Sequence, residues 1–372
     1  MDLNGYRQGI NDIDNQIEEL FKKRMELCIG VAEYKMEHDL PVLQKGREDE
    51  IIRRVRSEMP KWLEGGGALL FTTLMDISKL LQFQKILENT KAPEVLPLDL
   101  TNPASAAVPG ISGSYSHIAC GQFSDKLEPK FYSSFGEVFE AVENGETELG
   151  VLPIVNSTAG SVGQTYELLK EYDLSICATT KVEINHCLAA RKGLDIKNIV
   201  SVRSHEQALM QCSKFISEHG FKTVYDHNTS IAARNVAGSD APEAAICSEL
   251  CAKEQGLEIL ARSIADAGRN STRFILVSKK RLVPEGADII SVSLALPHEK
   301  ASLYRLLTKF SAAGLNLLMI ESRPIANTDF DVVFYLDFEG SLRSRQVQKL
   351  MGELEYELSY FRFLGNYKEI NK

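Results

Sequence analysis

Apolar residues recur at helical spacing through the first 92 residues. A seven-residue repeat predicts one long helix that ends before Pro41, and its apolar seam consists of Ile10, Ile13, Ile17, Leu20, Leu27, Val31 and Tyr34. A second helix is expected over 47–59, before Pro60, and a third over 68–88. The glycine triplet at 65–67 follows no strand and precedes no Lys-Ser/Thr pair, so it predicts a turn between helices instead of a phosphate loop.

The pattern changes twice after this helical segment. Residues 93–106 carry three prolines and no periodicity, which is typical of a linker. Over 107–283, short apolar runs alternate with helical patterns, so we expect an α/β domain with mostly parallel strands. Residues 287–372 follow the order strand, helix, strand, strand, helix, strand of a ferredoxin-like α+β domain. The chain is therefore expected to be multidomain.

Composition and charge exclude several functional classes. The chain has 372 residues, and its net charge of −9 argues against a general nucleic-acid or membrane binder. The seven cysteines are scattered, which favours reduced, buried thiols and a cytoplasmic location. Cys247 and Cys251 lie one helical turn apart, but no second His or Cys pair accompanies them, so core packing is preferred to a metal site. No segment is typical of a signal peptide or a membrane span.

Basic residues interrupt the first helix. Arg24 stands where the seam should be apolar, which indicates an ion pair, a snorkelling side chain or a ligand site. Lys35 lies eleven residues on, roughly 16 Å along the axis and on nearly the same face. Arg7 is about 25 Å from Arg24, so only an antiparallel partner chain could bring it to the same small ligand.

The other two helices add polar groups to the predicted bundle. Gln44, Arg47 and Glu48 share one helical face, and Ser78 and Gln82 share another. Together with Arg24 and Lys35 they predict a site for a small dianion.

Over residues 5–88 the chain resembles the all-helical, intertwined chorismate mutases, in the spacing R-17-R-11-K, then "GRE", then S-x3-Q. The resemblance implies that Arg7 of the partner chain, Arg24, Lys35 and Arg47 grip the carboxylates and ether oxygen of chorismate. It also implies that Glu48 and Ser78 hold the ring hydroxyl and that Gln82 faces the ether oxygen. Gln44 replaces an acidic residue of some members, so weaker orientation of that hydroxyl is expected.

Five motifs in the middle segment resemble prephenate dehydratases. They are "GISGSYSHIA" (110–119), "LPIVNSTAGSV" (152–162), "SHEQALMQC" (204–212), "NTSIAA" (228–233) and "NSTRF" (270–274). The resemblance implies a two-lobed fold like that of periplasmic binding proteins, and the conversion of prephenate to phenylpyruvate, CO2 and water. Hydroxide is a poor leaving group, so a positioned proton donor is required.

Within these motifs the resemblance implies particular roles. Thr272 fits the proton donor, acting directly or through water, and Arg273 fits the carboxylate partner. The remaining substrate-binding candidates are Ser114, His117, Asn156, Ser157, Thr158, Ser204, Gln211 and Phe274. Val155 stands where the family carries Glu, which either slows the dehydratase or changes only loop support. His205 is either a general base or a structural histidine.

The C-terminal segment resembles the ACT domains of phenylalanine-controlled enzymes, through "GLNLLMIESRP" (314–324). The family's Gly-Ala-Leu motif reads "ASL" here, with Ala301 at the glycine. The resemblance implies L-phenylalanine binding between subunits by Leu303, Asn316, Leu317, Glu321, Ser322 and Arg323. The alternative is a dimerisation module whose pocket has decayed.

The leading hypothesis is a bifunctional enzyme that carries mutase, dehydratase and phenylalanine sensor in one chain, as a homodimer or homotetramer. No metal or other cofactor is expected. A mutase fused to a dehydrogenase is disfavoured because no G-x-G-x-x-G follows a strand. The remaining alternative is an active mutase fused to a dehydratase-like binding domain that has lost its chemistry.

Overall fold

The computed structural model describes residues 2–38, 40, 45–86, 95–266, 268, 270–324 and 332–371. The chain forms two compact units. Unit 1 comprises residues 1–94 and 289–363, and unit 2 comprises residues 95–288 and 364–372. Among the described residues, no helix is both long enough and apolar enough to cross a membrane.

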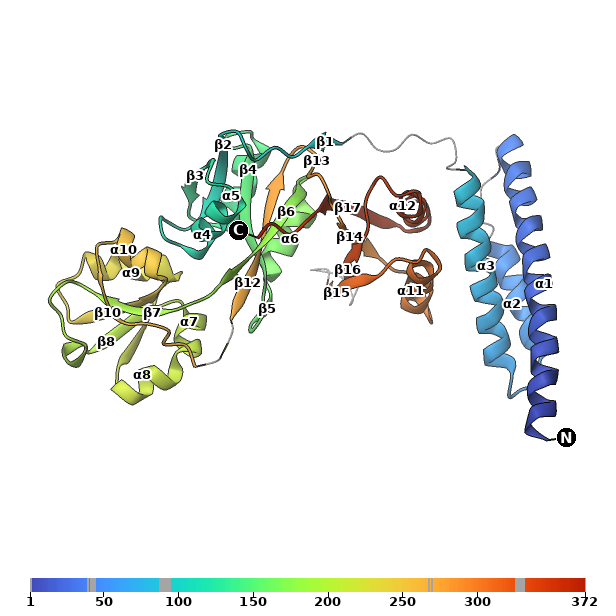
Figure 1. Ribbon diagram of the computed structural model, residues 1–372, viewed down its shortest axis with the longest axis horizontal. Coiled ribbons are helices and arrows are strands. Elements are labelled where there is room, and N and C mark those ends of the chain that lie inside the picture. Colours follow the sequence, from blue (N-terminus) through green and yellow to red (C-terminus); the bar gives the residue numbers. More distant parts are fainter. Residues whose placement is uncertain are drawn as a thin grey trace. The chain divides into compact units, whose positions relative to one another are not determined.

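Unit 1 begins with three helices (Figure 1): α1 (Leu3–Glu37), α2 (Lys45–Glu58) and α3 (Glu64–Ile86). The prediction of a turn at 65–67 was wrong, because these glycines lie inside α3. A Cβ on Gly67 would lie 3.0 Å from Met59 Cγ and 3.3 Å from Val55 Cγ1. The missing side chain therefore lets α3 pass close to α2. Pro41, the predicted helix stop, lies outside the described residues.

The two faces of α1 differ in burial. Met25, Ala32 and Lys35 are the buried residues of this helix, and α1 packs against α3. The predicted apolar seam instead faces solvent, with Leu27 74% exposed. The other exposed seam residues are Ile10, Ile13, Ile17, Leu20, Val31 and Tyr34. An exposed apolar stripe of this length is typical of an interaction surface.

The rest of unit 1 follows the strand–helix order that the sequence predicted. Its elements are β14 (Ile289–Ala295), α11 (Ser302–Ala312), β15 (Leu317–Pro324), β16 (Val332–Glu339), α12 (Arg345–Glu357) and β17 (Tyr360–Tyr367). The strands lie in the order β15-β16-β14-β17. Phe310 and Leu306 of α11 and Leu350 and Leu354 of α12 pack on the sheet in one apolar core.

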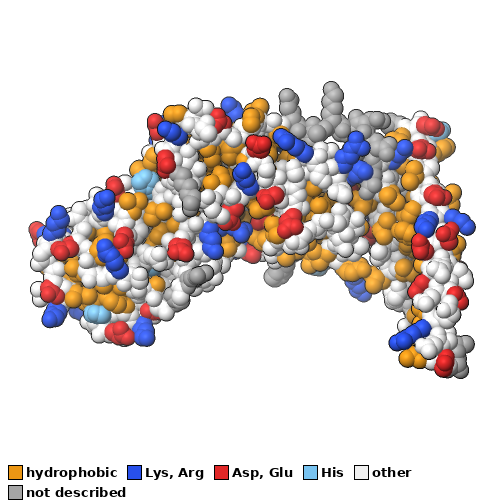
Figure 2. All heavy atoms as spheres, viewed as in Figure 1, with side chains coloured by type: hydrophobic (Ala, Val, Ile, Leu, Met, Phe, Trp, Pro, Cys, Tyr) orange, Lys and Arg blue, Asp and Glu red, His pale blue; other side chains and the backbone are white. Residues whose placement is uncertain are grey.

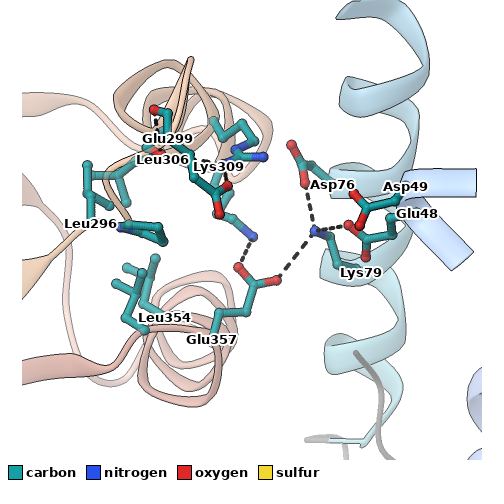
Figure 3. Close-up of a pocket in the computed structure, with 14 residues that line it drawn as sticks. Glu48, Asp49, Asp76, Lys79, Leu296, Glu299, Leu306, Lys309, Leu354 and Glu357 are labelled. Carbon is teal, nitrogen blue, oxygen red and sulfur yellow. Dashed lines mark hydrogen bonds and ion pairs between the residues drawn. The ribbon is translucent and has the colours of Figure 1, made fainter. Parts of the chain in front are cut away.

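A network of buried charges joins α3 to α11 and α12 (Figure 3). Lys79 lies 2.9 Å from Asp76, 3.4 Å from Glu48 and 3.7 Å from Glu357. Burial alone lowers the pKa of Lys79, but the three carboxylates outweigh it and raise that pKa above its usual value.

The same network continues into α11 and α12. Lys309 pairs with Glu357 at 2.9 Å and also with Glu353. Burial raises the pKa of Glu353 to about 7, although Lys309 opposes the shift. A pocket of about 210 Å³ opens among these side chains.

Unit 2 contains two large sheets, which define two lobes, and one sheet of two short strands. The first lobe has the strand order β6-β12-β4-β2-β3. Its elements are β2 (Ala104–Pro109), α4 (Tyr115–Phe123), β3 (Leu127–Tyr132), α5 (Phe135–Glu143), β4 (Leu149–Asn156), β5 (Gly160–Ser161), α6 (Gly163–Glu171), β6 (Ser175–Glu183) and β12 (Ser271–Ser278). Two short strands, β1 (Leu96–Pro97) and β13 (Leu282–Val283), pair beside it.

Helices cover both faces of the first-lobe sheet. Ala119 and Phe123 of α4 pack on one face, and Val138 and Val142 of α5 surround Gly150 on the other. The last residues of β17 run beside β6, where a Cβ on Gly365 would lie 2.2 Å from the Ile176 carbonyl oxygen. Only glycine fits this close approach without displacing the strand.

The second lobe has the strand order β11-β7-β10-β8-β9. Its elements are β7 (Cys187–Ala190), a 3₁₀ turn (Ile196–Asn198), β8 (Ser201–Ser204), α7 (Glu206–Gln211), α8 (Ser213–His219), β9 (Lys222–Tyr225), α9 (Thr229–Ala237), β10 (Glu243–Cys247), α10 (Glu249–Glu254) and β11 (Glu258–Ala261). Cys247 and Cys251 pack with Cys187 in an apolar cluster. Within the described ranges, no three His, Cys, Asp or Glu side chains gather as metal ligands.

Strand directions are mixed in both lobes. The β2–β3, β2–β4, β8–β9 and β8–β10 pairs are parallel, as predicted. The prediction of mostly parallel strands was wrong for β12 and β7, which run antiparallel to their neighbours. The antiparallel strands adjoin the two crossings between the lobes, at residues 184–186 and 262–270. The chain leaves the first lobe after β6 and returns to it at β12, and these two strands run in opposite directions.

Candidate functional site

Four of the predicted mutase residues meet between α1 and α3. Arg24 donates to Ser78 Oγ at 2.5 Å and to the Leu74 carbonyl at 2.9 Å. One helical turn further along α3, Lys35 Nζ lies 3.5 Å from Gln82 Oε1. Ser78, Gln82 and Lys35 are buried, and burial lowers the pKa of Lys35. This is a set of cationic and neutral donors in an apolar setting, suited to a small dianion.

Of the other predicted mutase residues, Arg7 and Arg47 are exposed, whereas the charge of Glu48 acts on Lys35 and raises its pKa, against the effect of burial. Arg47 is exposed and pairs with Glu50 at 2.7 Å. Glu48 is held by Lys79, as Figure 3 shows. Arg7 is exposed near the start of α1, away from Arg24, as the helical rise required. Gln44 lies outside the described residues.

Thr272 lies at the start of β12, directly opposite Asn156 at the end of β4. Both side chains are buried, and Asn156 Nδ2 lies 2.8 Å from Thr272 Oγ1 and 2.9 Å from Asn270 Oδ1. Asn156 Oδ1 accepts from the backbone N–H groups of Thr158 at 3.0 Å and Ala159 at 2.8 Å. Thr272 Oγ1 therefore accepts a hydrogen bond from Asn156, and its own proton is directed elsewhere.

The loop after β4 is tied to the start of β12. Ser157 N–H donates to the Ser271 carbonyl at 2.8 Å, and Ser271 N–H donates to Ser157 Oγ at 3.0 Å. Thr158 Oγ1 lies 3.4 Å from Asn270 Oδ1. The structure thus brings the predicted residues Asn156, Ser157 and Thr158 to Thr272.

Ser114 and His117 shape the glycine-rich turn before α4. Ser114 caps the helix by accepting from His117 N–H at 3.2 Å, and His117 Nδ1 accepts from Gly113 N–H at 3.0 Å. A Cβ on Gly113 would lie 2.4 Å from Cys251 Cα, so the turn approaches α10 closely. Burial lowers the pKa of His117, and Glu254 acts in the opposite direction.

In the second lobe, Ser204 is fully buried and donates to the Ile246 carbonyl at 2.7 Å. His205 is exposed and caps α7, where its Nδ1 accepts from Gln207 N–H at 3.3 Å. This contact favours the structural alternative for His205. Gln211, at the end of α7, accepts from Asn270 Nδ2 at 3.1 Å and so reaches the Thr272 cluster from the other lobe.

Thr272 and Arg273 are adjacent in the sequence, but their side chains lie on opposite faces of β12. Side chains alternate along a strand, so Thr272 and Phe274 are buried on one face of β12, whereas Arg273 is exposed on the other. Arg273 stands between Val155 of β4 and Lys181 of β6. The departure from the family at Val155 therefore falls on the face opposite Thr272.

The predicted phenylalanine residues lie on β15 and around α11. Leu303, Asn316 and Ser322 are exposed, Leu317 is half-buried, and Glu321 pairs with Arg323 at 3.0 Å. Strand β15 ends the sheet order within unit 1. Its exposed residues include Leu318 and Ile320, an apolar pair on an edge strand.

The structure places four further residues next to the candidate sites, and the sequence had suggested no role for any of them. They are Lys79, Asn270, His186 and Tyr115. Lys79 holds Glu48, and Asn270 contacts Asn156. His186 lies between Tyr115 and Gln211, at 3.1 Å from each. The sequence signal for His186 was only a polar Asn-His pair between two apolar runs.

On the face shown in Figure 2, basic and acidic side chains are interspersed over unit 2. On this face, anion binding would therefore depend on individual placed groups and not on a broad basic surface.

Comparisons with known proteins match two segments of the chain to two families. Residues 6–83 match the model of the type II chorismate mutase family, and residues 106–282 match that of the prephenate dehydratase family. The chain thus combines a helical mutase region with an α/β dehydratase domain.

Full-length relatives have the same organisation. The bifunctional chorismate mutase/prephenate dehydratase of Buchnera aphidicola subsp. Schizaphis graminum is 30% identical over 100% of this chain and 97% of its own length. That of Escherichia coli K12 is 30% identical over 98% and 96%. A prephenate dehydratase from Arthrobacter aurescens, solved with L-Phe, is 32% identical with a TM-score of 0.66, over 71% of this chain and 90% of its own. This chain belongs to the bifunctional chorismate mutase/prephenate dehydratase family.

The position of Val155 yields a prediction that separates its two interpretations. Val155→Glu places a carboxylate opposite Arg273. A cross-strand charge pair should raise the free energy of unfolding by about 0.2–1 kcal/mol, measured by denaturant titration. Because Thr272 faces the other side of the sheet, dehydratase kcat should stay within about twofold. Val155→Gln is the uncharged control. A kcat that rises tenfold in Val155→Glu would show that the family's Glu acts on catalysis.

Proposed function

We propose that the helices α1–α3 convert chorismate to prephenate and that unit 2 converts prephenate to phenylpyruvate at Thr272. The donors gathered between α1 and α3 support the first assignment. The buried Thr272 hydroxyl, which accepts from Asn156, supports the second. The division into a mutase segment (1–92), a linker (93–106), a dehydratase domain (107–283) and a regulatory domain (287–372) belongs to this proposal. So does a cytoplasmic location, for which the burial of six of the seven cysteines is the support.

The mutase needs no covalent chemistry. Arg24 and Lys35 hold the dianionic substrate in its reactive conformation and stabilise negative charge on the breaking C–O bond. Gln82 faces the ether oxygen, and Glu48 and Ser78 hold the ring hydroxyl. Arg47 leaves its ion pair with Glu50 and binds a substrate carboxylate instead. A bound carboxylate also offsets the burial that lowers the pKa of Lys35.

The exposed seam of α1 supports a homodimer in which a second α1 lies antiparallel to the first. Burying the seam is favourable, and it brings the partner's Arg7 to the site of Arg24 and Lys35. A dimer or tetramer with shared mutase sites follows.

Mixing two inactive variants tests this sharing. Arg7→Ala and Arg24→Ala should each lose mutase activity as homodimers. When the two are refolded together, about half of the dimers are mixed, and each mixed dimer has one intact site and one doubly altered site. About a quarter of the wild-type mutase turnover should therefore return, measured by chorismate consumption. If Arg7 acted in its own chain, every site in the mixture would keep one defect and no activity would return.

The dehydratase removes two groups from prephenate. The ring carboxylate leaves as CO2, and its bonding electrons complete the aromatic ring as the ring hydroxyl departs. The Thr272 hydroxyl donates a hydrogen bond to this departing oxygen, which leaves as water after taking up a proton. N–H and hydroxyl groups of Asn156, Ser157 and Thr158 hold the substrate from the Thr272 face, with Phe274 behind them. Arg273 remains the candidate partner for a carboxylate of prephenate that reaches the exposed face at the start of β12.

The candidates that contact backbone have supporting roles in this proposal. Ser114 and His117 fix the glycine-rich turn, and Ser204 fixes the end of β8 where α7 begins. Gln211 connects the second lobe to the Thr272 cluster.

The two activities serve as controls for each other. Thr272→Ala should lower dehydratase kcat roughly 100-fold or more while mutase kcat is retained. Arg24→Ala should lower mutase kcat by at least roughly 100-fold and spare the dehydratase assayed with prephenate. Thr272→Ser, which keeps the hydroxyl, is the matched control. Prephenate that accumulates unchanged with the wild-type chain would instead favour a dehydratase-like binding domain.

For the C-terminal segment we propose an ACT-type domain of ferredoxin-like plan that binds L-phenylalanine between subunits. The strand order β17-β14-β16-β15 and the exposed apolar edge strand β15 support it. Leu303, Asn316, Leu317, Glu321, Ser322 and Arg323 line the proposed site. Ala301, which replaces the family's glycine, has φ +65°, a left-handed conformation that glycine adopts without strain.

This strain predicts the effect of restoring the glycine. Ala301→Gly should raise the free energy of unfolding by about 1 kcal/mol and leave L-phenylalanine affinity equal or higher. Calorimetric titration of both full-length chains with L-phenylalanine measures the affinity. Absence of heat in the wild type and in Ala301→Gly would favour the decayed module, whereas binding in Ala301→Gly alone would assign the defect to this residue.

A further inference from the structure

A chain of polar side chains runs beneath Thr272 and crosses between the lobes of unit 2. From Thr272 it passes through Asn156 and Asn270 to Gln211 in the second lobe. From Gln211 it continues through His186 to the Tyr115 hydroxyl in the first lobe. Every link is 2.8–3.1 Å long. Asn270 and His186 lie in the two crossings, so the chain passes through both connections between the lobes.

The direction of these hydrogen bonds is fixed at Asn156. Its Oδ1 accepts from two backbone N–H groups, those of Thr158 and Ala159, and a backbone N–H is able only to donate. The Nδ2 group of Asn156 therefore faces Thr272 and Asn270, and the opposite amide orientation is excluded.

This orientation propagates through the two following amides. Asn270 presents Oδ1 to Asn156, so its Nδ2 donates to Gln211 Oε1. Gln211 Oε1 is then an acceptor, and His186 Nε2, 3.1 Å away, must carry a proton to donate to it. The backbone N–H groups of the turn after β4 fix Asn156, and the contacts that follow then fix the tautomer of the buried His186.

The remaining ring nitrogen lies next to Tyr115. Burial lowers the pKa of His186 and so favours the neutral ring, in which a protonated Nε2 leaves Nδ1 as an acceptor. The Tyr115 hydroxyl donates to the Asn185 carbonyl at 2.7 Å, and its oxygen lies 3.1 Å from Nδ1. Because the single hydroxyl proton goes to Asn185, the contact with Gln211 sets the tautomer. If the ring adopted the other tautomer, the bare Nε2 would face Gln211 Oε1 and the chain would break.

We propose that His186 is a positioning residue of the dehydratase. Its Nε2–H donates to Gln211 Oε1 and so holds Gln211 and Asn270 in place, and Asn270 Oδ1 in turn holds Asn156 Nδ2 and Thr158 Oγ1 beside Thr272. Asn156, placed in this way, donates to Thr272 Oγ1, so that the Thr272 proton is directed toward the oxygen leaving the substrate. The proposal rests on the proposed donor role of Thr272.

The effect expected from a broken chain is on turnover and not on binding. His186 is 2% exposed and lies three links from Asn156, so it touches no substrate. Without its N–H, Gln211 and Asn270 lose a fixed orientation, and the Asn270 oxygen that places Asn156 Nδ2 and Thr158 Oγ1 beside Thr272 is no longer held. In metalloenzymes, residues that hydrogen-bond to a metal ligand without touching the metal affect activity by about 10–100-fold, and we expect a similar effect here. A residue that only held the lobes together would affect stability or KM instead.

The test compares His186→Leu with His186→Gln, whose side-chain amide keeps a donor near the position of Nε2. In His186→Leu we expect dehydratase kcat to fall about 10–100-fold, with KM for prephenate within about threefold. His186→Gln should recover most of this loss. Mutase turnover of the same full-length protein, assayed with chorismate, should be unchanged in both, because its residues lie in unit 1. Gln211→Leu breaks the chain at the next link and provides a second measurement should His186→Leu fail to fold.

Three results would overturn the proposal. They are a wild-type dehydratase kcat in His186→Leu and Gln211→Leu, a change confined to KM, and a His186→Gln variant as impaired as His186→Leu. The proposed function fails differently, because it is refuted by a Thr272→Ala variant that keeps its dehydratase turnover. If Thr272→Ala loses dehydratase turnover as expected and any of the three results is also found, only the role of His186 is refuted.

Discussion

The hydrogen bonds around Asn156 are the constraint on which the dehydratase site depends. One amide oxygen is held by two backbone N–H groups of the following turn, and this leaves the amide nitrogen facing Thr272 and Asn270. A buried hydroxyl that already accepts a strong donor is oriented to donate. In the proposed role of Thr272, its weak acidity is less important than its geometry, because that role requires only a hydrogen bond aimed at the departing oxygen. The two lobes contribute to this one arrangement through the crossings that carry His186 and Asn270.

In the helical segment, charged side chains are the groups proposed to bind the substrate. Two cations and two neutral polar groups meet between α1 and α3, and three of the four are buried, so their interactions with the proposed dianionic substrate would be strengthened. The same helix leaves its apolar seam in solvent, and one predicted cation, Arg7, remains far from the others. Both observations have a single explanation if a second copy of α1 covers the seam. In unit 1 the Lys79 network also ties Glu48 to α11 and α12, so one predicted mutase residue is bonded into the segment proposed to sense phenylalanine.

Much of the fold was predictable because the sequence patterns are local. Helical periodicity gave the three N-terminal helices, and the alternation of runs gave the α/β and βαββαβ segments. The glycine triplet was misread because its cause is tertiary, namely the approach of Gly67 to Met59 and Val55. The antiparallel directions of β7 and β12 were also missed, since strand direction depends on where the chain crosses between lobes.

The sequence alone determined which residues are available for chemistry. The spacing of Arg24 and Lys35, the order of five motifs and the pair Thr272–Arg273 are properties of the chain before it folds. Tertiary structure decided which of them meet. Asn156 and Asn270 are 114 residues apart and touch, whereas Thr272 and Arg273 are adjacent and face opposite sides of a sheet. His186 acquired its place in the Thr272 chain only through folding, because a hydrogen bond depends on distance and direction in space and not on separation along the sequence.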